Sequence, residues 1–297
     1  MVPYQGVVVV GDLLTDVVVV HDGAIQAGSD TTAAVTVAGG GQGANTAAWL
    51  AYAGCPVTLV AAVGDDLAGR ERIAELTTLG VGSAVRAHPG AATGSVVVLS
   101  SADERTMITD RGAALLLDPA DVRAAVAVAD AVHLHLSGYP LLDAASRPGG
   151  LAALAAARER GLTTSVDAAS AAPLRRVGAR AFLDWVRGAD LLLCNTDEAA
   201  VLAGTGTPAD QARNLTAVVR NVVVKCGGAG AVWSDREGLL RSVTSSPVPM
   251  IDPTGAGDAF AAGLLAAWCS GAEPAAALAA GAALGSAAVG RVGARPA

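Results

Sequence analysis

The segment Asp252-Pro-Thr-Gly-Ala-Gly-Asp258 joins a glycine-rich turn to a carboxylate at the start of a helical run. An apolar, extended stretch precedes the turn, and a run rich in Ala and Leu follows it. Such a turn directs several backbone N–H groups at one point, where their unpaired hydrogens and the helix dipole favour an anion. Gly255 and Gly257 would let a phosphate approach the backbone closely. Asp258 would then lie beside the phosphate, where it could accept a proton from an attacking hydroxyl.

The same segment also allows a purely structural interpretation. Asp258 could be a helix N-cap, and Gly255 and Gly257 could be ordinary turn residues. An isolated Gly-x-Gly would favour that interpretation. Here two glycines, an aspartate and the start of a helix coincide, and we therefore favour the phosphate site.

A second glycine-rich loop, Gly39-Gly-Gly-Gln42-Gly43-Ala44-Asn45, leads into another predicted helix. The amide side chains of Gln42 and Asn45 can both donate and accept hydrogen bonds, which suits the hydroxyls of a sugar. Taken alone, the loop is equally compatible with a flexible turn and an N-cap.

The elements that must position these residues alternate between strands and helices. Short apolar runs predict buried strands at residues 7–10, 57–63, 131–136, 162–166, 190–194 and 221–225. Helical composition is found at residues 45–53, 68–79, 119–129, 150–160, 180–187, 197–203 and 208–218. This alternation predicts one α/β domain over residues 1–297, in which helices cover both faces of a mostly parallel sheet.

Polar or glycine residues follow many of these strands. Ligands bind at the carboxyl ends of the strands in such sheets, so we expect these residues to collect at one edge. They are Asp12, Asp16, Gly64, Ser137, Asp167, Asn195, Gly227 and Gly255. Residues 13–38 and 91–112 do not fit the alternation and are richer in Thr, Ser and β-branched residues. We expect them to pair as a small accessory sheet.

Composition excludes several classes of function. A net charge of −7, with Lys225 as the only lysine, argues against a nucleic-acid partner and against a Gly-Lys-Ser/Thr phosphate loop. The four cysteines are widely spaced without a Cys-x-x-Cys pair, so we expect reduced thiols and no zinc site. Acidic residues and Pro274 interrupt the apolar runs, and the N-terminus lacks the basic flank of a secretion signal. We therefore expect a cytoplasmic protein without a membrane span.

Four stretches resemble the ribokinase-like (PfkB) carbohydrate kinase family, in the order found in that family. They are Val9–Asp16, Gly40–Asn45, Asn195–Glu198 and Asp252–Phe260. The resemblance implies a three-layer α/β/α fold with a mostly parallel central sheet and a small β lid. The lid would come from residues of about 13–38 and 91–112. The implied activity is transfer of the γ-phosphate of ATP, with Mg²⁺, to a primary hydroxyl of a sugar or sugar-like substrate.

The resemblance also implies a role for each matched residue. Asp258 would be the catalytic base, and the backbone of Gly255, Ala256 and Gly257 would form the anion hole. The residues that would hold the sugar are Asp16, Gly40, Gly41, Gln42 and Asn45. The nucleotide side would include Asn195, Glu198, Lys225, Gly227 and Gly230, with Asn195 and Glu198 organising Mg²⁺ through water. Asp252 and Thr254 would contribute to a monovalent-cation site, for which K⁺ is the candidate.

The sequence departs from many ribokinases at two sugar-contacting positions. Leu14 stands where an asparagine is common, and Gln42 stands where a lysine is common, so ribose itself is not predicted. A nucleoside kinase stays open, because Leu14 could lie against a base, as does a sensor that binds sugar or nucleotide without catalysis. We interpret Arg105 and Arg111 as lid-surface residues, one of which could reach a phosphorylated substrate. Exposed lid strands often pair between subunits, so a homodimer is the expected assembly.

Overall fold

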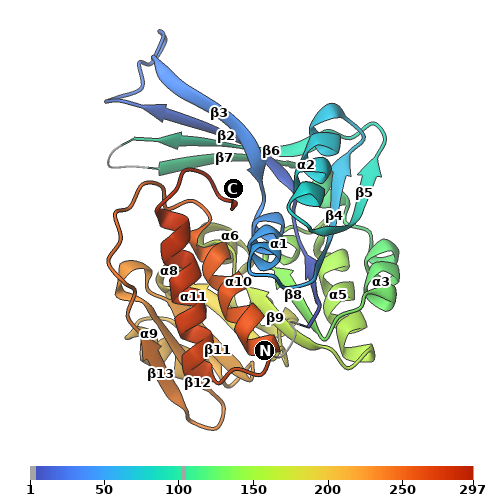
Figure 1. Cartoon of the computed structure of the whole chain (residues 1–297), viewed down its shortest axis with the longest axis vertical. Coiled ribbons are helices and arrows are strands. Elements are labelled where there is room, and N and C mark those ends of the chain that lie inside the picture. Colours follow the sequence, from blue (N-terminus) through green and yellow to red (C-terminus); the bar gives the residue numbers. More distant parts are fainter. Residues whose placement is uncertain (1–4, 102–104, 297) are drawn as a thin grey trace.

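A large, mostly parallel sheet forms the centre of the fold (Figure 1). The computed structural model describes residues 5–101 and 105–296, and within these residues the sheet has nine strands. Residues 102–104 of the second accessory segment, with residues 1–4 and 297 of the expected domain, lie outside the described residues. In spatial order the strands are β13 (Leu240–Val243), β12 (Ala231–Asp235), β11 (Asn221–Lys225), β10 (Leu191–Asn195), β9 (Thr163–Asp167), β8 (His133–Ser137), β1 (Val7–Val10), β4 (Val57–Gly64) and β5 (Gly82–His88).

The strands from β11 to β5 pair in parallel, and β12 runs antiparallel to both of its neighbours. In β1, Val7 and Val9 pack into one core while Val8 and Val10 pack into the other, because successive side chains of a strand point to opposite faces. All four valines are buried. Such continuous apolar strands are typical of a parallel sheet that is covered on both sides.

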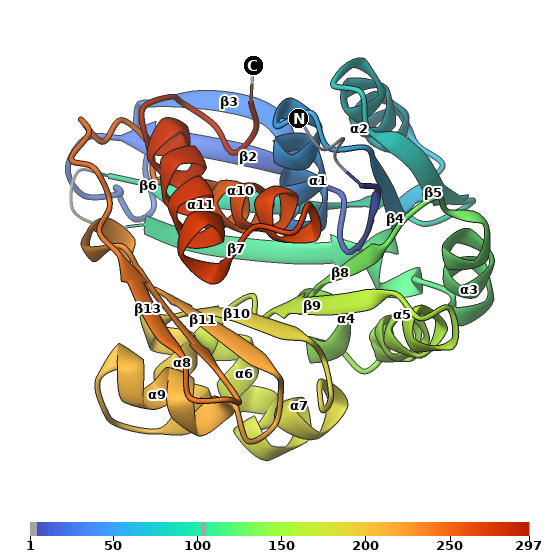
Figure 2. The same cartoon turned by 60° about the horizontal axis from the view of Figure 1, so that its bottom comes forward.

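Helices cover both faces of this sheet, as the sequence predicts (Figure 2). On one face lie α1 (Gln42–Tyr52), α2 (Leu67–Thr78), α10 (Ala256–Cys269) and α11 (Pro274–Val289). On the other lie α3 (Pro119–Val128), α5 (Arg147–Glu159), α6 (Ala171–Val177), α7 (Ala179–Trp185), α8 (Thr196–Ala203) and α9 (Pro208–Leu215). A single-turn helix, α4 (Tyr139–Leu142), follows β8. The three-layer α/β/α architecture is therefore confirmed.

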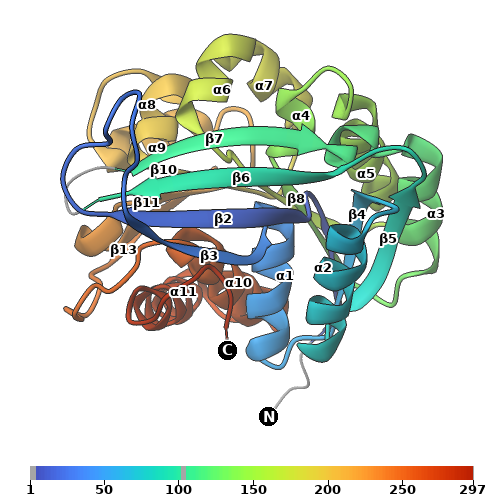
Figure 3. The same ribbon diagram turned by 90° about the horizontal axis from the view of Figure 1, so that it is seen from above.

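The two accessory segments form a separate four-stranded sheet in the described residues (Figure 3). Its strands, in spatial order, are β3 (Ala33–Gly40), β2 (Leu14–His21), β6 (Thr93–Ser100) and β7 (Arg105–Gly112). The central pair β2 and β6 is parallel, and both outer pairs are antiparallel. Leu14 of β2 and Val96 and Val98 of β6 form a small buried apolar cluster in this sheet. The predicted pairing is confirmed, while the role of the sheet as a lid stays a prediction.

The carboxyl ends of the parallel strands meet at one edge of the large sheet. Ser137 at the end of β8 is paired with Asp167 at the end of β9, and Asn195 at the end of β10 is paired with Lys225 at the end of β11. Asp16 differs from this expectation, because it lies inside β2 of the small sheet.

Some elements escaped prediction or begin elsewhere. Strands β5, β12 and β13 and helix α11 were not predicted, and α1 begins at Gln42 rather than at Asn45. Small residues allow α10 and α11 to approach closely: a Cβ on Gly263 would lie 2.6 Å from the carbonyl oxygen of Ala280. In the described part of the chain, no helix has both the length and the apolar character needed to cross a bilayer.

Candidate active site

The first turn of α10 lies between two cavities. Gly255 and Asp258 line a cavity of about 180 Å³, whereas Ala256 and Gly257 line a second cavity of about 500 Å³. Gly255 is the N-cap of α10 and has a φ of 75°, a left-handed conformation that favours glycine. Of the predicted anion hole of Gly255, Ala256 and Gly257, the Ala256 N–H already donates to the Pro253 carbonyl over 3.3 Å. Among the described residues, the N–H groups of Gly257 and of the next residue, Asp258, find no hydrogen-bond acceptor. Two backbone donors are therefore available to an anion at this turn.

Asp258 does not cap its helix. It is the third residue of α10, and Gly255 provides the N-cap without any side-chain hydrogen bond. The carboxylate of Asp258 instead accepts a hydrogen bond from Asn45 Nδ2, with 3.0 Å between Nδ2 and Oδ2. Burial raises the pKa of Asp258 to about 7, against the lowering effect of the Asn45 hydrogen bond. A carboxyl with a pKa near neutrality is suited to general base catalysis.

The residues predicted to hold the sugar surround the smaller cavity. Its walls include Asp16, Gly41, Gln42 and Asn45. Gly40 is not part of the wall, but a Cβ there would lie 2.0 Å from Oδ1 of Asp16, so glycine makes room for this carboxylate.

The amide of Gln42 is held at both ends. Its Nε2 donates to Asp167 Oδ1 over 2.9 Å, and its Oε1 accepts from the Ser137 hydroxyl over 2.6 Å. The hydroxyl and the carboxylate together fix the orientation of the side chain that faces the cavity.

Lys225, Gly227 and Gly230 line the larger cavity, on the opposite side of the α10 turn. Lys225 forms a buried ion pair with Asp167, and its Nζ would lie 3.5 Å from a Cβ on Gly257. Burial opposes the charge of Lys225, but Asp167 and Glu198 outweigh it and raise the pKa of the ammonium group. The lysine therefore carries its positive charge beside the two free N–H groups.

Asn195 and Glu198 bind each other at the start of α8. The Asn195 side chain accepts from the Glu198 N–H, and Glu198 accepts from the Asn195 N–H in a capping box. Glu198 is 2% exposed, and burial followed by the charge of Asp167 raises its pKa to about 7. No group of three or more His, Cys, Asp or Glu side chains is arranged to hold a metal ion within the described residues.

The Asp252 carboxylate accepts hydrogen bonds that fix the loop before α10. Its Oδ1 accepts from the Thr254 N–H over 2.9 Å, and its Oδ2 accepts from the Gly293 N–H over 2.9 Å. The predicted cation-site residues therefore lie together with the C-terminal segment, and the cation site itself stays a prediction.

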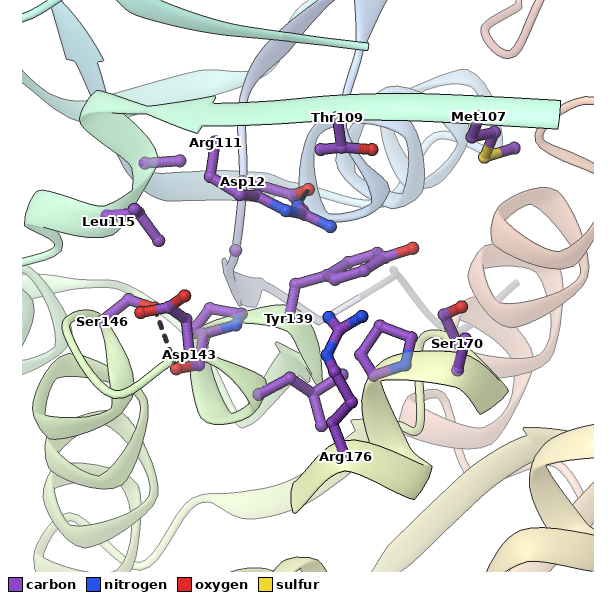
Figure 4. A pocket seen from close by; sticks show the side chains of 16 residues that line it. Asp12, Met107, Thr109, Arg111, Leu115, Tyr139, Asp143, Ser146, Ser170 and Arg176 are labelled. Carbon is purple, nitrogen blue, oxygen red and sulfur yellow. Dashed lines mark hydrogen bonds and ion pairs between the residues drawn. The ribbon is translucent and has the colours of Figure 1, made fainter. Parts of the chain in front are cut away.

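The structure corrects the interpretation of Arg111 as a lid-surface residue. It lies at the end of β7 and forms an ion pair with Asp12, with 2.6 Å between Nη1 and Oδ2. Its guanidinium carbon also lies 3.6 Å from the centre of the Tyr139 ring. Arg111, Asp12 and Tyr139 all line the cavity of about 180 Å³ and an adjoining cavity of about 490 Å³, which Arg176 enters from α6 (Figure 4). The sequence signal available for Arg111 was its position just before Gly112, at the end of a strand.

Arg295 was missed altogether. Its Nε donates to Asn45 Oδ1 over 3.1 Å, and its Nη2 donates to the Gly40 carbonyl over 2.8 Å. The side chain is 9% exposed. Nothing in the local sequence indicates that a residue so near the end of the chain reaches these two loops.

Comparisons with known proteins establish the family and the fold. Residues 5–297 match the sequence profile described as pfkB family carbohydrate kinase. The chain belongs to the pfkB carbohydrate kinase family. The resemblance drawn from the four sequence stretches is thereby confirmed, and the protein is a kinase.

Two curated relatives share about a third of the residues with this pfkB family kinase. One is 2-dehydro-3-deoxygluconokinase of Thermoproteus tenax, 32% identical over 79% of this chain and 74% of that protein. The other is ATP-dependent ribose-1-phosphate kinase of Halopiger xanaduensis, 32% identical over 87% of this chain and 83% of that protein.

Solved structures support the fold of this pfkB family kinase. Adenosine kinase of Sinorhizobium meliloti has a TM-score of 0.88 at 24% identity and covers 99% of this chain and 96% of its own. An E. coli protein provisionally named ribokinase II, solved with ATP and Mg²⁺, has a TM-score of 0.83 at 24% identity, with 98% and 94% covered. At these identities the likeness concerns the fold alone.

Proposed function

We propose that this kinase transfers the γ-phosphate of ATP to a primary hydroxyl of a sugar or sugar-like molecule. The observation that carries the proposal is the position of the first α10 turn between a polar cavity and a nucleotide-sized cavity. A phosphoryl group that passes from one cavity to the other must cross this turn. The free N–H groups and the proposed base lie at the crossing.

The proposed chemistry follows from these groups. The acceptor hydroxyl lies in the smaller cavity and gives its proton to Asp258 as its oxygen forms a bond to the γ-phosphorus. The bond from that phosphorus to the ADP oxygen breaks, and ADP leaves through the larger cavity. The N–H groups of Gly257 and Asp258 donate to the oxygens of the transferred group, and the Lys225 ammonium adds positive charge beside them.

Mg²⁺ would be bound mainly by the phosphates and by water, which is the usual arrangement for this ion. Glu198 and Asn195 fit a supporting role through water, because Glu198 lies close enough to Lys225 to raise the pKa of its ammonium group, and Asp167 in turn raises the pKa of Glu198. When bound, the ion would neutralise phosphate charge. The proposed K⁺ site at Asp252 and Thr254 is tested by comparing turnover in potassium and sodium salts.

The acceptor site supports a monosaccharide-sized substrate. Its volume of about 180 Å³ lies below the ~300–1,000 Å³ typical of sites for larger ligands. Asp16, Gln42 and Asn45 offer polar groups, while Leu14 and Val96 provide an apolar wall. Arg111 and Arg176 in the adjoining cavity favour a substrate with an anionic group. The names of the two curated relatives denote kinases of an acidic and of a phosphorylated sugar.

A nucleoside kinase is the second candidate. Leu14, Val96, Val98 and Met107 form an apolar wall, and the adjoining cavity of about 490 Å³ would provide room for a base. The non-catalytic sensor that the sequence left open is not proposed, because the chain belongs to a kinase family.

An ADP-release assay over a substrate panel tests the proposal. The panel contains neutral sugars, sugar acids, sugar phosphates and nucleosides, and Asp258→Asn is the control. Turnover of a sugar would support the first candidate, and turnover of nucleosides alone would support the second. Absence of turnover with all four substrate classes would overturn both candidates.

We also propose that the small sheet pairs with a second copy of the chain. Val35, Val37 and Ile108 expose more than half of their surface on its strands, and such apolar strands are open to pairing. Light scattering after size exclusion measures the oligomeric state, and a monomer at micromolar concentration would contradict the pairing.

A further inference from the structure

The C-terminal segment brings a charged side chain to the amide that contacts the proposed base. Arg295 Nε donates to Asn45 Oδ1 over 3.1 Å, and Asn45 Nδ2 donates to Asp258 Oδ2 over 3.0 Å. The guanidinium does not line the acceptor cavity. Two hydrogen bonds in series therefore connect Arg295 to Asp258, while Arg295 itself stays away from the reacting atoms.

Several contacts hold the C-terminal segment in this place. The Gly293 N–H donates to Asp252, and the Trp49 indole donates to the Ala294 carbonyl over 2.9 Å. Arg295 Nη1 lies 3.4 Å from Glu75 Oε2. A Cβ on Gly39 would lie 2.0 Å from Nη1 of Arg295, so the guanidinium occupies space that any larger residue at position 39 would fill. These contacts hold the Arg295 side chain in one position.

The direction of the Asn45 amide matters for the base. The oxygen and nitrogen ends of an asparagine side chain have nearly the same shape, so packing alone does not choose between its two orientations. Arginine can only donate hydrogen bonds, and Oδ1 must therefore face Arg295. Nδ2 then faces Asp258, where a donor favours the ionised carboxylate. A reversed amide would place its oxygen against that carboxylate and disfavour ionisation.

We propose that Arg295 is a positioning residue for phosphoryl transfer: through Asn45 it orients the amide that keeps Asp258 ready to accept a proton. The inference rests on the proposed function, in which Asp258 is the base. It assigns a role to the C-terminal segment that neither glycine-rich loop of the sequence indicates.

The other charges around Asp258 set the background for this effect. Asp12 and Asp167 raise the pKa of Asp258, and Lys225 lowers it. The remaining ionisable groups that face the site are Tyr139 and Asp16, with Arg111 paired to Asp12. Burial lowers the pKa of Arg295 to about 10, against the effect of Glu75 and Asp16, so the side chain is charged at neutral pH. Loss of Arg295 removes both the orienting donor and a nearby positive charge, and both changes disfavour the ionised base.

The dependence of kcat on pH tests the proposal with Arg295→Met. A rise of about one unit in the pKa of the acidic limb would lower kcat about tenfold at pH 6 and less than about twofold at pH 9. The matched control is Arg291→Met, because Arg291 lies 5.6 Å from the Trp49 ring centre in the same segment and is not hydrogen-bonded to Asn45. We expect the control to keep the wild-type profile.

A double-mutant cycle with Asn45→Ala then separates this role from a structural one. In the Asn45→Ala background, Arg295→Met should shift the acidic limb much less, because the part of the effect that passes through Asn45 is already lost and only the loss of the nearby positive charge remains. Arg295→Lys keeps the charge but lacks the planar fork, and we expect a smaller shift in the same direction.

Three results would overturn the proposal. They are a wild-type profile in folded Arg295→Met, a uniform loss of kcat at every pH, and an undiminished shift in the Asn45→Ala background. If Arg295→Met does not fold, a wild-type profile of Arg295→Lys would overturn it instead. Absence of turnover in the wild-type protein over the whole panel would refute the proposed function, whereas wild-type turnover with an unshifted variant refutes only the role of Arg295.

Discussion

Gly257 is a position where stability and activity should change in opposite directions. A Cβ at this residue would have Lys225 Nζ at 3.5 Å as its only neighbour within 4 Å among the described atoms, which is an ordinary contact. Gly257 is the second residue of α10 and does not have a positive φ. Alanine loses less backbone entropy than glycine on folding, so Gly257→Ala is expected to stabilise the protein by about 0.5–1 kcal/mol. For a chain of this size the Tm should rise by about 1–4 °C.

The same methyl group should damage catalysis. It would project into the space in front of the Gly257 and Asp258 N–H groups, where a phosphate oxygen must come within about 3 Å of the nitrogen. Loss of one such donor typically lowers kcat about 100- to 1,000-fold, and we expect a loss in that range. Sugar binding should change little, because Gly257 does not line the acceptor cavity.

ADP-release kinetics and thermal denaturation of the same samples measure both effects. Gly290→Ala at the end of α11 is the control, because its Cβ would lie 3.7 Å from the nearest atom and outside all three site cavities. Gly255→Ala should lose both properties, since its φ is 75° and its Cβ would lie 2.3 Å from the Ala294 carbonyl oxygen. A stabilised Gly257→Ala with wild-type kcat would refute the anion hole, and a destabilised one would refute our account of the space around it.

Asp258→Asn should lower kcat by about 10²–10⁴-fold while the calorimetric Kd for the sugar changes little, and equal losses of both would contradict the role of the base. The kcat of the wild-type protein should fall as the pH drops below about 7, because protonated Asp258 cannot accept a proton, and a flat profile from pH 5 to 8 would argue against it. Asp167→Asn should lower the free energy of unfolding by about 3–5 kcal/mol, since the Lys225 ammonium loses its buried partner. Urea denaturation measures this loss, and adding Lys225→Met should recover most of it. Burial would raise the pKa of Asp167 but Lys225 lowers it on balance, so this stabilisation is present at neutral pH and is lost as the pH falls through the folded pKa.

Local pattern explains why much of the fold and part of the candidate site could be predicted. The turn before Asp258 needs glycine at its left-handed position, and the parallel strands need continuous apolar runs. Both features depend on residues that are neighbours in the sequence, so both could be predicted. Helix α11 lacks such a signal, because its Ala and Gly residues serve close packing on α10 rather than a periodic apolar face. Arg295 lies 250 residues from its partner Asn45, and only the path of the folded chain brings the two together.

Asp167 was expected at this edge of the sheet, but its partners were not, and its contacts connect the two cavities of the proposed site. One of its oxygens accepts from Gln42, which lines the proposed acceptor cavity, and the other accepts from Lys225, which lines the proposed nucleotide cavity. The carboxylate is 2% exposed, and water therefore competes little with either contact. Since a single buried carboxylate holds both side chains, a displacement of Gln42 changes the charge environment of Lys225. The turn of α10 separates the two cavities proposed for the reactants. Asp167 contacts a side chain from each cavity and so couples the charges on the two sides of this turn.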